Sequence, residues 1–288
     1  MNGRLPLIKG VEPIELLTQR SAVAGWKKTA SGLHPVSVTA SCSGIVASHL
    51  YSGLLTKVTW FVRRFGWAEV FRKPLRLALA PLIIPCLKPR SFQWRGHSLD
   101  AFYHRYNITW AGERMVEIPI AKMFLERFAG KTIVEVGNVM QHYGPIAHQV
   151  IDKYEVGPGV ENMDVLDFRP GKKIDLLLSI STFEHIGFDD DDGKSSGQKI
   201  LDAVRHCRSI ISENGTLVIT VPLGYNPDLD RLIQTGALGS SSISFLRRVG
   251  FSNWEETDLA TACQHPYGWR FPYANSLAVI EFSALASE

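Results

Sequence analysis

Apolar residues follow two alternating periodicities from about Phe92 to the end of the chain. Short runs of apolar and β-branched residues predict strands, and stretches in which apolar residues recur every three or four positions predict helices. The predicted strands span residues 132–136, 150–155, 163–168, 173–182, 215–223, 254–262 and 275–282. The predicted helices span residues 109–130, 196–212 and 240–251, and the first should begin or kink at Pro119.

The run KIDLLLSIST at 173–182 is apolar almost throughout, which is typical of a central parallel strand buried on both faces. Strands that alternate with helices indicate right-handed crossovers and hence a parallel sheet. The last two predicted strands lie close together in the sequence, which indicates an antiparallel pair at one edge. We therefore expect an α/β domain built around one mostly parallel sheet.

The first 90 residues have a different pattern. Residues 1–56 lack clear periodicity, and their segment TASGLHPVSVTASCSGIVASH is rich in Ser, Ala and Gly. Residues 57–90 interleave Trp and Phe with Arg and Lys. The sequence thus predicts a basic, partly helical or loosely ordered N-terminal extension over residues 1–90 and a core domain over residues 91–288.

The basic-aromatic segment 57–90 contains the longest strongly apolar run without charge, Leu77–Leu87. This run has 11 residues and is broken by Pro81 and Pro85, whereas a membrane crossing needs about 20. The segment fits either an amphipathic helix with peripheral membrane contact or a basic helix packed on the core domain. The N-terminus has no continuous apolar stretch, so we expect no secretory signal and a cytoplasmic location.

Charge is distributed unevenly along the 288 residues, whose net charge is +3. The first 100 residues carry 14 Lys+Arg against 4 Asp+Glu, or +10, and the remainder carries 17 against 24, or −7. The basic part suits an anionic partner such as a lipid surface, nucleic acid or the acidic half of the same chain. The acidic remainder argues against nucleic acid as a substrate of the core domain.

The four cysteines offer no metal site or disulfide framework. Cys42, Cys86, Cys207 and Cys263 lie far apart, and no pair has CxxC spacing. Reduced thiols are therefore the expected state.

The segment TIVEVGNVMQHYG, residues Thr132–Gly144, carries the clearest chemistry. A predicted strand ending near Glu135 passes through Gly137 into an expected helix start, which exposes backbone N–H groups at the carboxyl edge of the sheet. Open α/β sheets bind nucleotide-like ligands at this edge. An acidic strand end in place of a second phosphate-binding glycine favours a ligand with a positive centre and ribose hydroxyls, such as S-adenosylmethionine.

The region from about Phe92 to Phe282 resembles the class I S-adenosylmethionine-dependent methyltransferases. Glu135 and Gly137 match the start of the family motif E/D-x-G-x-G-x-G, whereas Val139 and Gln141 replace its second and third glycines. The segments IDLLLSISTFEHIG and GTLVITVP also resemble the family pattern. The resemblance implies a Rossmann-like, seven-stranded, mostly parallel sheet with an antiparallel edge pair, and S-adenosyl-L-methionine as the cofactor.

The segments YNITWAGERMVEIPI, LDF, SISTFEH and VPLGYNP further resemble a bacterial methyltransferase-like group associated with surface-polysaccharide synthesis. This resemblance implies O-methylation of a small or glycan-linked acceptor. A non-catalytic binding module in polysaccharide assembly is the alternative, because two motif glycines are missing. A nicotinamide-dependent oxidoreductase is disfavoured, since GNVMQHYG lacks the G-x-G-x-x-G cradle.

The resemblance also implies cofactor-binding residues. Glu135 would order the glycine loop near the methionine ammonium group, Gly137 would allow close backbone approach, and Asn138 would bind the methionine carboxylate. Asp152 would accept the ribose hydroxyls, with Glu155 as the competing residue. The remaining assignments are Asp164 for the adenine amino group, with Asp167 as its alternative, and Ser181 at the exit of the fourth strand.

The acceptor side is predicted around His185, which is either a general base or a packing residue. Tyr225 and Asn226 would line this side, and the segment 106–114 would close over the cofactor or pack as a surface helix. His265, Tyr267 and Trp269 are expected to contact the substrate or cover the sheet edge. The acidic run Asp189–Asp192 is expected to be a solvated loop rather than a metal site.

Overall fold

The computed structural model describes residues 25–29, 32–36, 62, 67–188, 196–268, 270–271 and 273–285. The chain divides into two compact units, Met1–Ile45 and Val46–Glu288. In the first unit, β1 (Gly25–Thr29) and β2 (Gly32–Val36) pair as an antiparallel hairpin. The predicted boundary at residue 90 stays a prediction.

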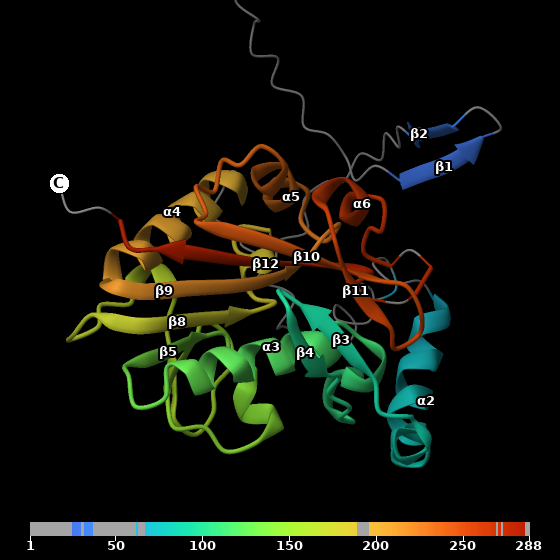
Figure 1. Ribbon diagram of the computed structural model, residues 1–288, viewed down its shortest axis with the longest axis horizontal. Helices are drawn as coiled ribbons and strands as arrows, with labels where there is room; N and C mark the ends of the chain where they lie inside the picture. The colour runs from blue at the N-terminus through green and yellow to red at the C-terminus, as the bar shows by residue number, and fades with distance from the viewer. Residues whose placement is uncertain are drawn as a thin grey trace, which may run out of the picture. The chain divides into compact units, whose positions relative to one another are not determined.

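An eight-stranded sheet forms the centre of the second unit (Figure 1). In their order across the sheet, its strands are β11 (Trp254–Thr257), β10 (Ser242–Arg248), β12 (Ser276–Ser283), β9 (Ile211–Pro222), β8 (Ile174–Ile180), β5 (Ile133–Val136), β6 (Gln149–Asp152) and β7 (Val160–Asn162). The five strands from β9 to β7 pair in parallel, and β12, β10 and β11 join by antiparallel pairing. The expected α/β Rossmann-like sheet, mostly parallel with antiparallel strands at one edge, is confirmed, with one strand more than predicted.

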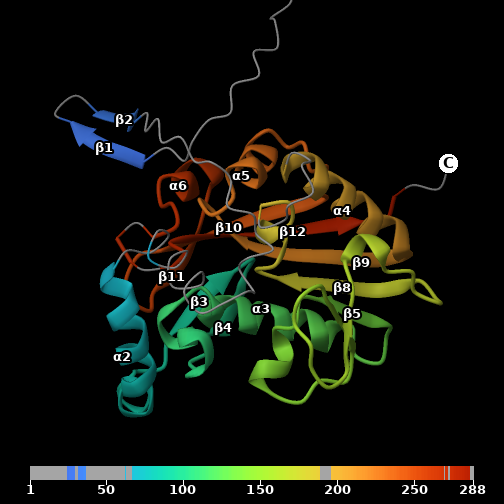
Figure 2. The same ribbon diagram turned by 180° about the vertical axis from the view of Figure 1, so that it is seen from behind.

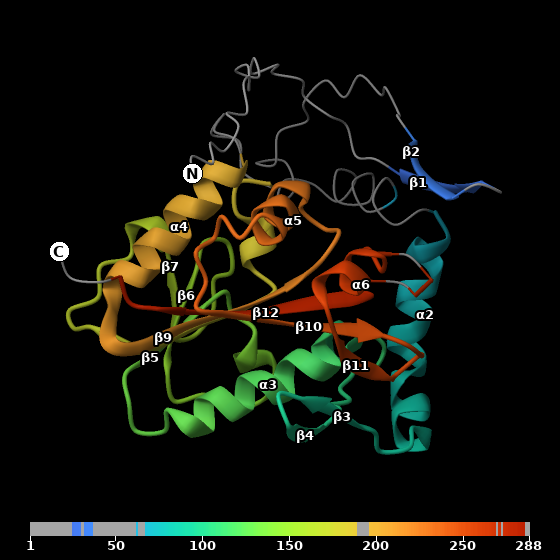
Figure 3. The same ribbon diagram turned by 45° about the horizontal axis from the view of Figure 1, so that its top comes forward.

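Helices cover both faces of the sheet (Figures 1 and 2). One face carries α4 (Ser196–Ile210), α5 (Pro227–Gln234) and α6 (Leu259–Cys263), and the other carries α3 (Arg114–Arg127) with the hairpin of β3 (Ser91–Trp94) and β4 (His97–Asp100) (Figure 3). The central strand β8 serves both layers, because successive side chains point to opposite faces. Leu177 packs in the α4 layer, while Leu176 and Leu178 pack in the α3 layer, and all three are fully buried.

The helix α3 begins at Arg114 and continues through Pro119, so the prediction that it begins or kinks at this proline is wrong about the start. Proline has no N–H to donate to the carbonyl four residues earlier. The structure satisfies that carbonyl from outside the helix, because Phe102 N donates to Met115 O at 2.9 Å. A tertiary hydrogen bond thus replaces the missing helical one.

The prediction of a helix over residues 240–251 is wrong, because this segment forms the strand β10. The strand pairs with β12 on one side and β11 on the other. Ile243 and Phe245 pack in the α4 layer and Leu246 packs in the α3 layer, as alternation along a strand requires. Three apolar residues within four positions are compatible with both the helical and the strand periodicity. The segment forms a strand because it pairs with a neighbouring strand on each side.

The prediction of a third strand over residues 163–168 is also wrong. The third parallel strand along the chain is β7, which ends at Asn162, and a 3-10 turn, η5 (Val165–Asp167), follows it. Asp164 caps this turn by accepting a hydrogen bond from Leu166 N at 3.0 Å. Local capping by a short acidic side chain competes with strand pairing and prevails here.

No regular α-helix follows β5, although the sequence predicted a helix start there. The connection from β5 to β6 contains only the 3-10 turn η4 (Met140–Tyr143).

At the other end of the unit, α2 (Trp67–Ile83) continues into η2 (Ile84–Cys86) and packs against the 3-10 segment η3 (Tyr106–Ala111). Among the helices in the described part of the chain, none combines the length and apolar character that a bilayer crossing needs.

Candidate functional site

The turn after β5 depends on a residue without a side chain, Gly137. Gly137 has a φ of 89°, and a Cβ atom here would overlap the hydroxyl of Thr182, which follows β8. The Gly137 N–H donates to Ile151 O in β6 at 2.8 Å. The glycine therefore lets the β5 turn lie directly against the exit of β8.

Glu135 lies fully buried beneath this turn. Its Oε1 accepts hydrogen bonds from Val139 N at 2.9 Å and Met140 N at 2.8 Å, and His148 Nε2 lies 2.7 Å from its Oε2. This arrangement orders the turn, because a buried carboxylate is stable only with such partners. The sequence analysis did not predict that His148 would contact Glu135, because the two residues are 13 positions apart in the chain.

Asn138 and Asp152 join the β5 turn to the end of β6. Asn138 N donates to Asp152 Oδ2 at 2.9 Å, and Asn138 Nδ2 donates to Glu155 Oε1 at 2.8 Å. Asp152 Oδ1 accepts from Tyr154 N and Glu155 N. The structure thus brings both predicted ribose ligands, Asp152 and Glu155, to one place beside Asn138, and Asn138 Oδ1 is buried without a hydrogen-bond partner among the described residues.

Asp164 follows β7 at the same edge of the sheet. Its carboxylate caps η5 and lies 3.0 Å from Lys153 Nζ. Both carboxylate oxygens therefore have protein partners, and the predicted adenine contact stays a prediction. Asp167 lies within the same 3-10 turn.

Five polar residues form a buried acid cluster at the carboxyl ends of β8 and β9: Arg114, Glu117, Ser181, Glu184 and Thr220. Ser181 Oγ and Thr220 Oγ1 each donate to Glu117 Oε1 at 2.6 Å. Arg114 Nη1 donates to Ile180 O at 3.1 Å and lies 3.6 Å from Glu117 Oε2. Ser181, predicted as a cofactor residue, thus binds a helix carboxylate in this structure.

The charges of the acid cluster depend on its burial. Burial raises the pKa of Glu117, although Arg114 opposes the shift. Burial also raises the pKa of Glu184 to about 7, against the opposing effect of the His185 charge. Burial alone would lower the pKa of Arg114, but Glu117 raises it, so the guanidinium stays charged.

Two carboxylate oxygens of the acid cluster, Glu117 Oε2 and Glu184 Oε2, are buried without a hydrogen-bond partner among the described residues. Both oxygens lie at the carboxyl edge of the sheet, where Asn138 Oδ1 also lies. The sequence offered one signal for Glu117, an acidic residue among the apolar positions of a buried helix, three residues after Arg114. Such a pair on a buried face indicates an internal ion pair.

His185 lies at the exit of β8 with its ring partly exposed. Its Nδ1 is 3.3 Å from the Tyr225 hydroxyl, and its Nε2 is 3.8 Å from Glu184 Oε1. The ring also packs edge-on against Tyr225, which contacts Phe188 and Tyr267. The structure therefore gathers His185 and Tyr225, predicted for the acceptor side, and Tyr267, predicted to contact the substrate or cover the sheet edge, into one aromatic group.

Asn226, also predicted for the acceptor side, connects this group to α5. Its Oδ1 accepts from Asp228 N and Leu229 N as the helix cap, while its Nδ2 donates to Glu184 O at 2.9 Å. The side chain is almost fully buried. It therefore fixes the segment that carries Glu184 and His185.

The segment predicted to close over the cofactor packs on η4. The Tyr106 ring stacks on His142 with centroids 4.2 Å apart, and Thr109 Oγ1 lies 2.8 Å from the Tyr143 hydroxyl. Two successive residues, Asn107 and Ile108, have φ values of 46° and 54°. A β-branched residue in this region is strained, so the contacts of the segment must hold it there.

Among the predictions for the site, those for the acidic run Asp189–Asp192 and for Trp269 lie outside the described residues, as does most of the predicted N-terminal extension. His265 Nδ1 lies 2.9 Å from Thr261 O in α6, which caps the helix end. Within the part of the chain that the structure describes, no group of three or more His, Cys, Asp or Glu residues is placed to hold a metal ion.

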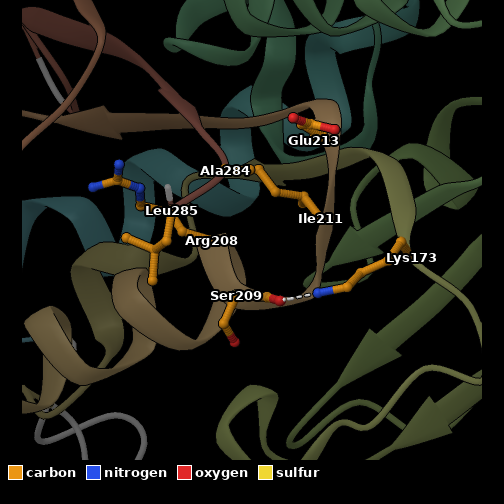
Figure 4. Close-up of a pocket in the computed structure, with 7 residues that line it drawn as sticks. All are labelled: Lys173, Arg208, Ser209, Ile211, Glu213, Ala284 and Leu285. Atoms are coloured by element: carbon orange, nitrogen blue, oxygen red, sulfur yellow. Dashed lines mark hydrogen bonds between the residues drawn. The ribbon is translucent and has the colours of Figure 1, made fainter. Parts of the chain in front are cut away.

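A pocket of about 540 Å³ lies at the opposite, amino edge of β8 and β9 (Figure 4). It is lined by Lys173, Arg208, Ser209, Ile211, Glu213, Ala284 and Leu285. Its two basic side chains donate to backbone carbonyls, Lys173 to Ser209 O and Arg208 to Ser283 O and Gly239 O. None of the residues predicted for cofactor or acceptor lines this pocket.

Comparison with known proteins finds no matching family model and no matching curated protein. Solved structures of similar fold include the N-methyltransferase NodS from Bradyrhizobium japonicum WM9 in complex with S-adenosyl-L-homocysteine, with 12% identity, a TM-score of 0.40, and coverage of 60% of this chain and 88% of that chain. A TehB-like methyltransferase from Corynebacterium glutamicum has 12% identity and a TM-score of 0.34 over 57% of this chain and 86% of its own.

A methyltransferase from Archaeoglobus fulgidus has 14% identity and a TM-score of 0.35 over 56% of this chain and 92% of its own. The names of all three solved proteins describe methyltransferases. The likeness is weak in each case, so the function proposed below rests on the residues of this chain.

Proposed function

We propose that this protein is an S-adenosylmethionine-dependent methyltransferase that O-methylates a small or glycan-linked acceptor. The observation that supports it most is that Asn138 Oδ1 and Glu184 Oε2, both buried at the carboxyl edge of the sheet, have no hydrogen-bond partner among the described residues. Buried acceptors without donors are costly, and a ligand rich in donors or positive charge removes that cost. S-adenosylmethionine offers an ammonium group, a sulfonium, ribose hydroxyls and an adenine amino group.

The cofactor would lie across the ends of β5 and β6. The turn at Gly137 gives backbone access, and Asn138 would contact the methionine part. Asp152 and Glu155, which already lie together, would receive the ribose hydroxyls, and Asp164 would face the adenine. Glu135 would act through the turn that it orders, since Val139 N, Met140 N and His148 occupy its carboxylate.

Once bound, the cofactor would supply an electrophilic methyl group. The contribution of the chain is to align the acceptor oxygen and to remove its proton. His185 would accept that proton, because its partly exposed ring lies at the exit of β8 beside Tyr225. Glu184, whose pKa is about 7, lies close enough to stabilise the protonated imidazole.

A non-catalytic binding module in surface-polysaccharide assembly is the second proposal. Its supporting observation is the connection after β5, where the four-residue turn η4 stands in place of the expected helix. The missing motif glycines and this short connection leave fewer backbone N–H groups to hold a cofactor tightly. Binding without methyl transfer would distinguish this module from the enzyme.

Calorimetric titration of the full chain with S-adenosylmethionine and with NAD tests the first proposal. We expect binding of the former only, and Asn138→Ala should weaken it about tenfold, the effect of one lost hydrogen bond in a buried site. Gln149→Ala is the matched control, because Gln149 is an exposed amide at the start of β6. Absence of S-adenosylmethionine binding up to millimolar concentration would overturn the cofactor assignment.

Transfer of a labelled methyl group to hydroxyl acceptors separates the two proposals. We expect His185→Ala to bind the cofactor with wild-type affinity but to lose about 100-fold in turnover, the usual contribution of a general base. A wild-type protein that binds the cofactor and methylates no small or glycan-linked acceptor would support the binding module instead.

A further inference from the structure

The helix α2 exposes its most apolar face. Trp67, Phe71, Leu75 and Leu82 are exposed by 69%, 73%, 57% and 70%. Their spacing of four, four and seven residues places them on one side of a helix. They form the α2 stripe, which also includes the exposed Ala78 between Leu75 and Leu82.

The opposite side of α2 packs on the domain. Ala80 is fully buried against η3, where it joins a cluster with Ile108 and Trp110. Lys73 and Arg76, on the same side as Ala80, are half-buried. The helix therefore turns Lys73 and Arg76 toward the protein and its large apolar residues toward solvent, the reverse of an ordinary surface helix, while Arg72 is exposed.

An exposed apolar stripe of this size indicates a surface that is covered by a partner. The views agree that α2 lies at one side of the unit, beyond the β11 edge of the sheet (Figures 1 to 3). One long face of the helix is thus turned away from the sheet. At 17 residues the helix is roughly 25 Å long, so it can lie along a flat surface.

The charge around the stripe identifies the partner. The helix carries Arg72, Lys73 and Arg76 against one acidic residue, Glu69. In the sequence, Arg63 and Arg64 precede it and Lys88 and Arg90 follow it, within a 100-residue region of charge +10. Cations bordering Trp, Phe and Leu match a bilayer with anionic headgroups and an apolar interior.

We propose that α2 docks this protein on an anionic membrane surface, with the α2 stripe inserted at the boundary between headgroups and acyl chains. The exposed cations near the stripe, Arg72 on the helix and Lys88 and Arg90 after it, contact lipid phosphates, and the sheet stays on the water side. This docking is independent of methyl transfer, because α2 contributes no residue to the acid cluster or the aromatic group.

Flotation of the full chain with lipid vesicles tests the proposal. The vesicles contain either phosphatidylcholine alone or phosphatidylcholine with about 30% phosphatidylglycerol, an anionic lipid whose negative surface potential attracts basic segments. We expect binding to the anionic vesicles that weakens in high salt. The triple variant Phe71→Gln, Leu75→Gln, Leu82→Gln should partition about 100-fold more weakly, since each side chain loses its apolar insertion.

The matched control is the double variant Val156→Gln, Leu285→Gln, which alters exposed apolar residues elsewhere on the unit. It should bind vesicles like the wild type, and both variants should keep wild-type affinity for S-adenosylmethionine. That readout separates failure of docking from failure of the proposed function.

Four results would overturn the proposal or one of its parts. The wild type could remain unbound to either vesicle, or the triple variant could bind as well as the wild type. Alternatively, the triple variant could convert a dimer to a monomer while the wild type ignores vesicles, which would identify a second copy as the partner. Equal wild-type binding to neutral and anionic vesicles would overturn the role of the cations.

Discussion

Gly137 shows how a single absent side chain sets the geometry of the site. Its positive φ and its contact with Thr182 bring the β5 turn and the β8 exit together. The glycine was predicted to allow close approach of a ligand, and in the structure the neighbouring strand makes the close approach. Both uses require the same residue, because each forbids a Cβ atom.

Gly137→Ala should destabilise the protein by about 2–4 kcal/mol, combining strained backbone with steric overlap. Adding Thr182→Ala removes the hydroxyl that the new methyl group would strike. We expect the double variant to recover about half of the loss, as measured by urea unfolding in a double-mutant cycle. Strictly additive losses would contradict the steric explanation.

Glu184 should make stability depend on pH. Its pKa is about 7 in the folded protein against an ordinary value of 4.5. The folded state therefore holds the proton more tightly, and the resulting stabilisation is complete below about pH 4.5 and is lost as the pH rises through 7. Glu184→Gln, which mimics the protonated form, should lack this loss.

Urea unfolding at pH 5 and pH 8 measures the difference. Relative to Glu184→Gln, the wild type should lose up to about 3 kcal/mol between these values. Asp230, whose pKa is also about 7, is present in both proteins, so its effect cancels. An equal pH response in the two proteins would mean that Glu184 is not buried as described.

The residues of the site differ in whether their neighbours in space are also their neighbours in sequence. Glu135, Gly137 and Asn138 could be placed together from the sequence, because they belong to one strand and one turn, and their role toward a cofactor stays a prediction. Glu117 and His148 were missed, because they meet their partners across 64 and 13 residues, Glu117 with Ser181 and His148 with Glu135. Sequence spacing says nothing about such pairings until the sheet order is known.

Among the elements, α5 depends on a residue that also serves the site. Asn226 caps the helix and holds the Glu184 carbonyl. Asn226→Ala should cost about 2 kcal/mol, roughly half from the cap and half from the lost tertiary hydrogen bond. It should also shift the NMR resonances of the His185 ring, because the segment that carries His185 loses its anchor.

Asp258→Ala is the matched control for that variant. Asp258 caps α6 through Thr261 N and does not contact the Glu184 segment in the structure. It should lower stability while leaving the His185 resonances unchanged. A shift of those resonances in both variants would contradict a specific role for Asn226.

Long, strongly patterned elements were predictable and short ones were not. The central strand β8 and the helix α4 match their apolar patterns, because burial on both faces or on one stripe leaves a clear period. The strand β10 was mistaken for a helix, since its pairing with β11 and β12 decides its conformation. The strand β7 (Val160–Asn162) ends before the predicted strand 163–168 begins, because Asp164 caps the 3-10 turn that follows it.

On the scale of the whole molecule, the sequence predicts the α/β class and the mostly parallel sheet. These follow from the alternation of strands and helices along nearly 200 residues, which tolerates errors in single elements. The outward orientation of the apolar face of α2 could not be predicted, because an amphipathic pattern does not reveal which face of a helix packs on the protein. The sequence left open both packing and membrane contact, and in the structure α2 packs on the domain with its apolar face outward.

The lengths of the edge strands have a consequence for how copies of this protein can associate. The sheet ends in β7, with three residues, on one side and in β11, with four, on the other. Strands this short present few free backbone N–H and C=O groups to another chain. At the edges of this sheet, strand-by-strand addition, the route to open-ended aggregates, therefore has few backbone groups to pair with.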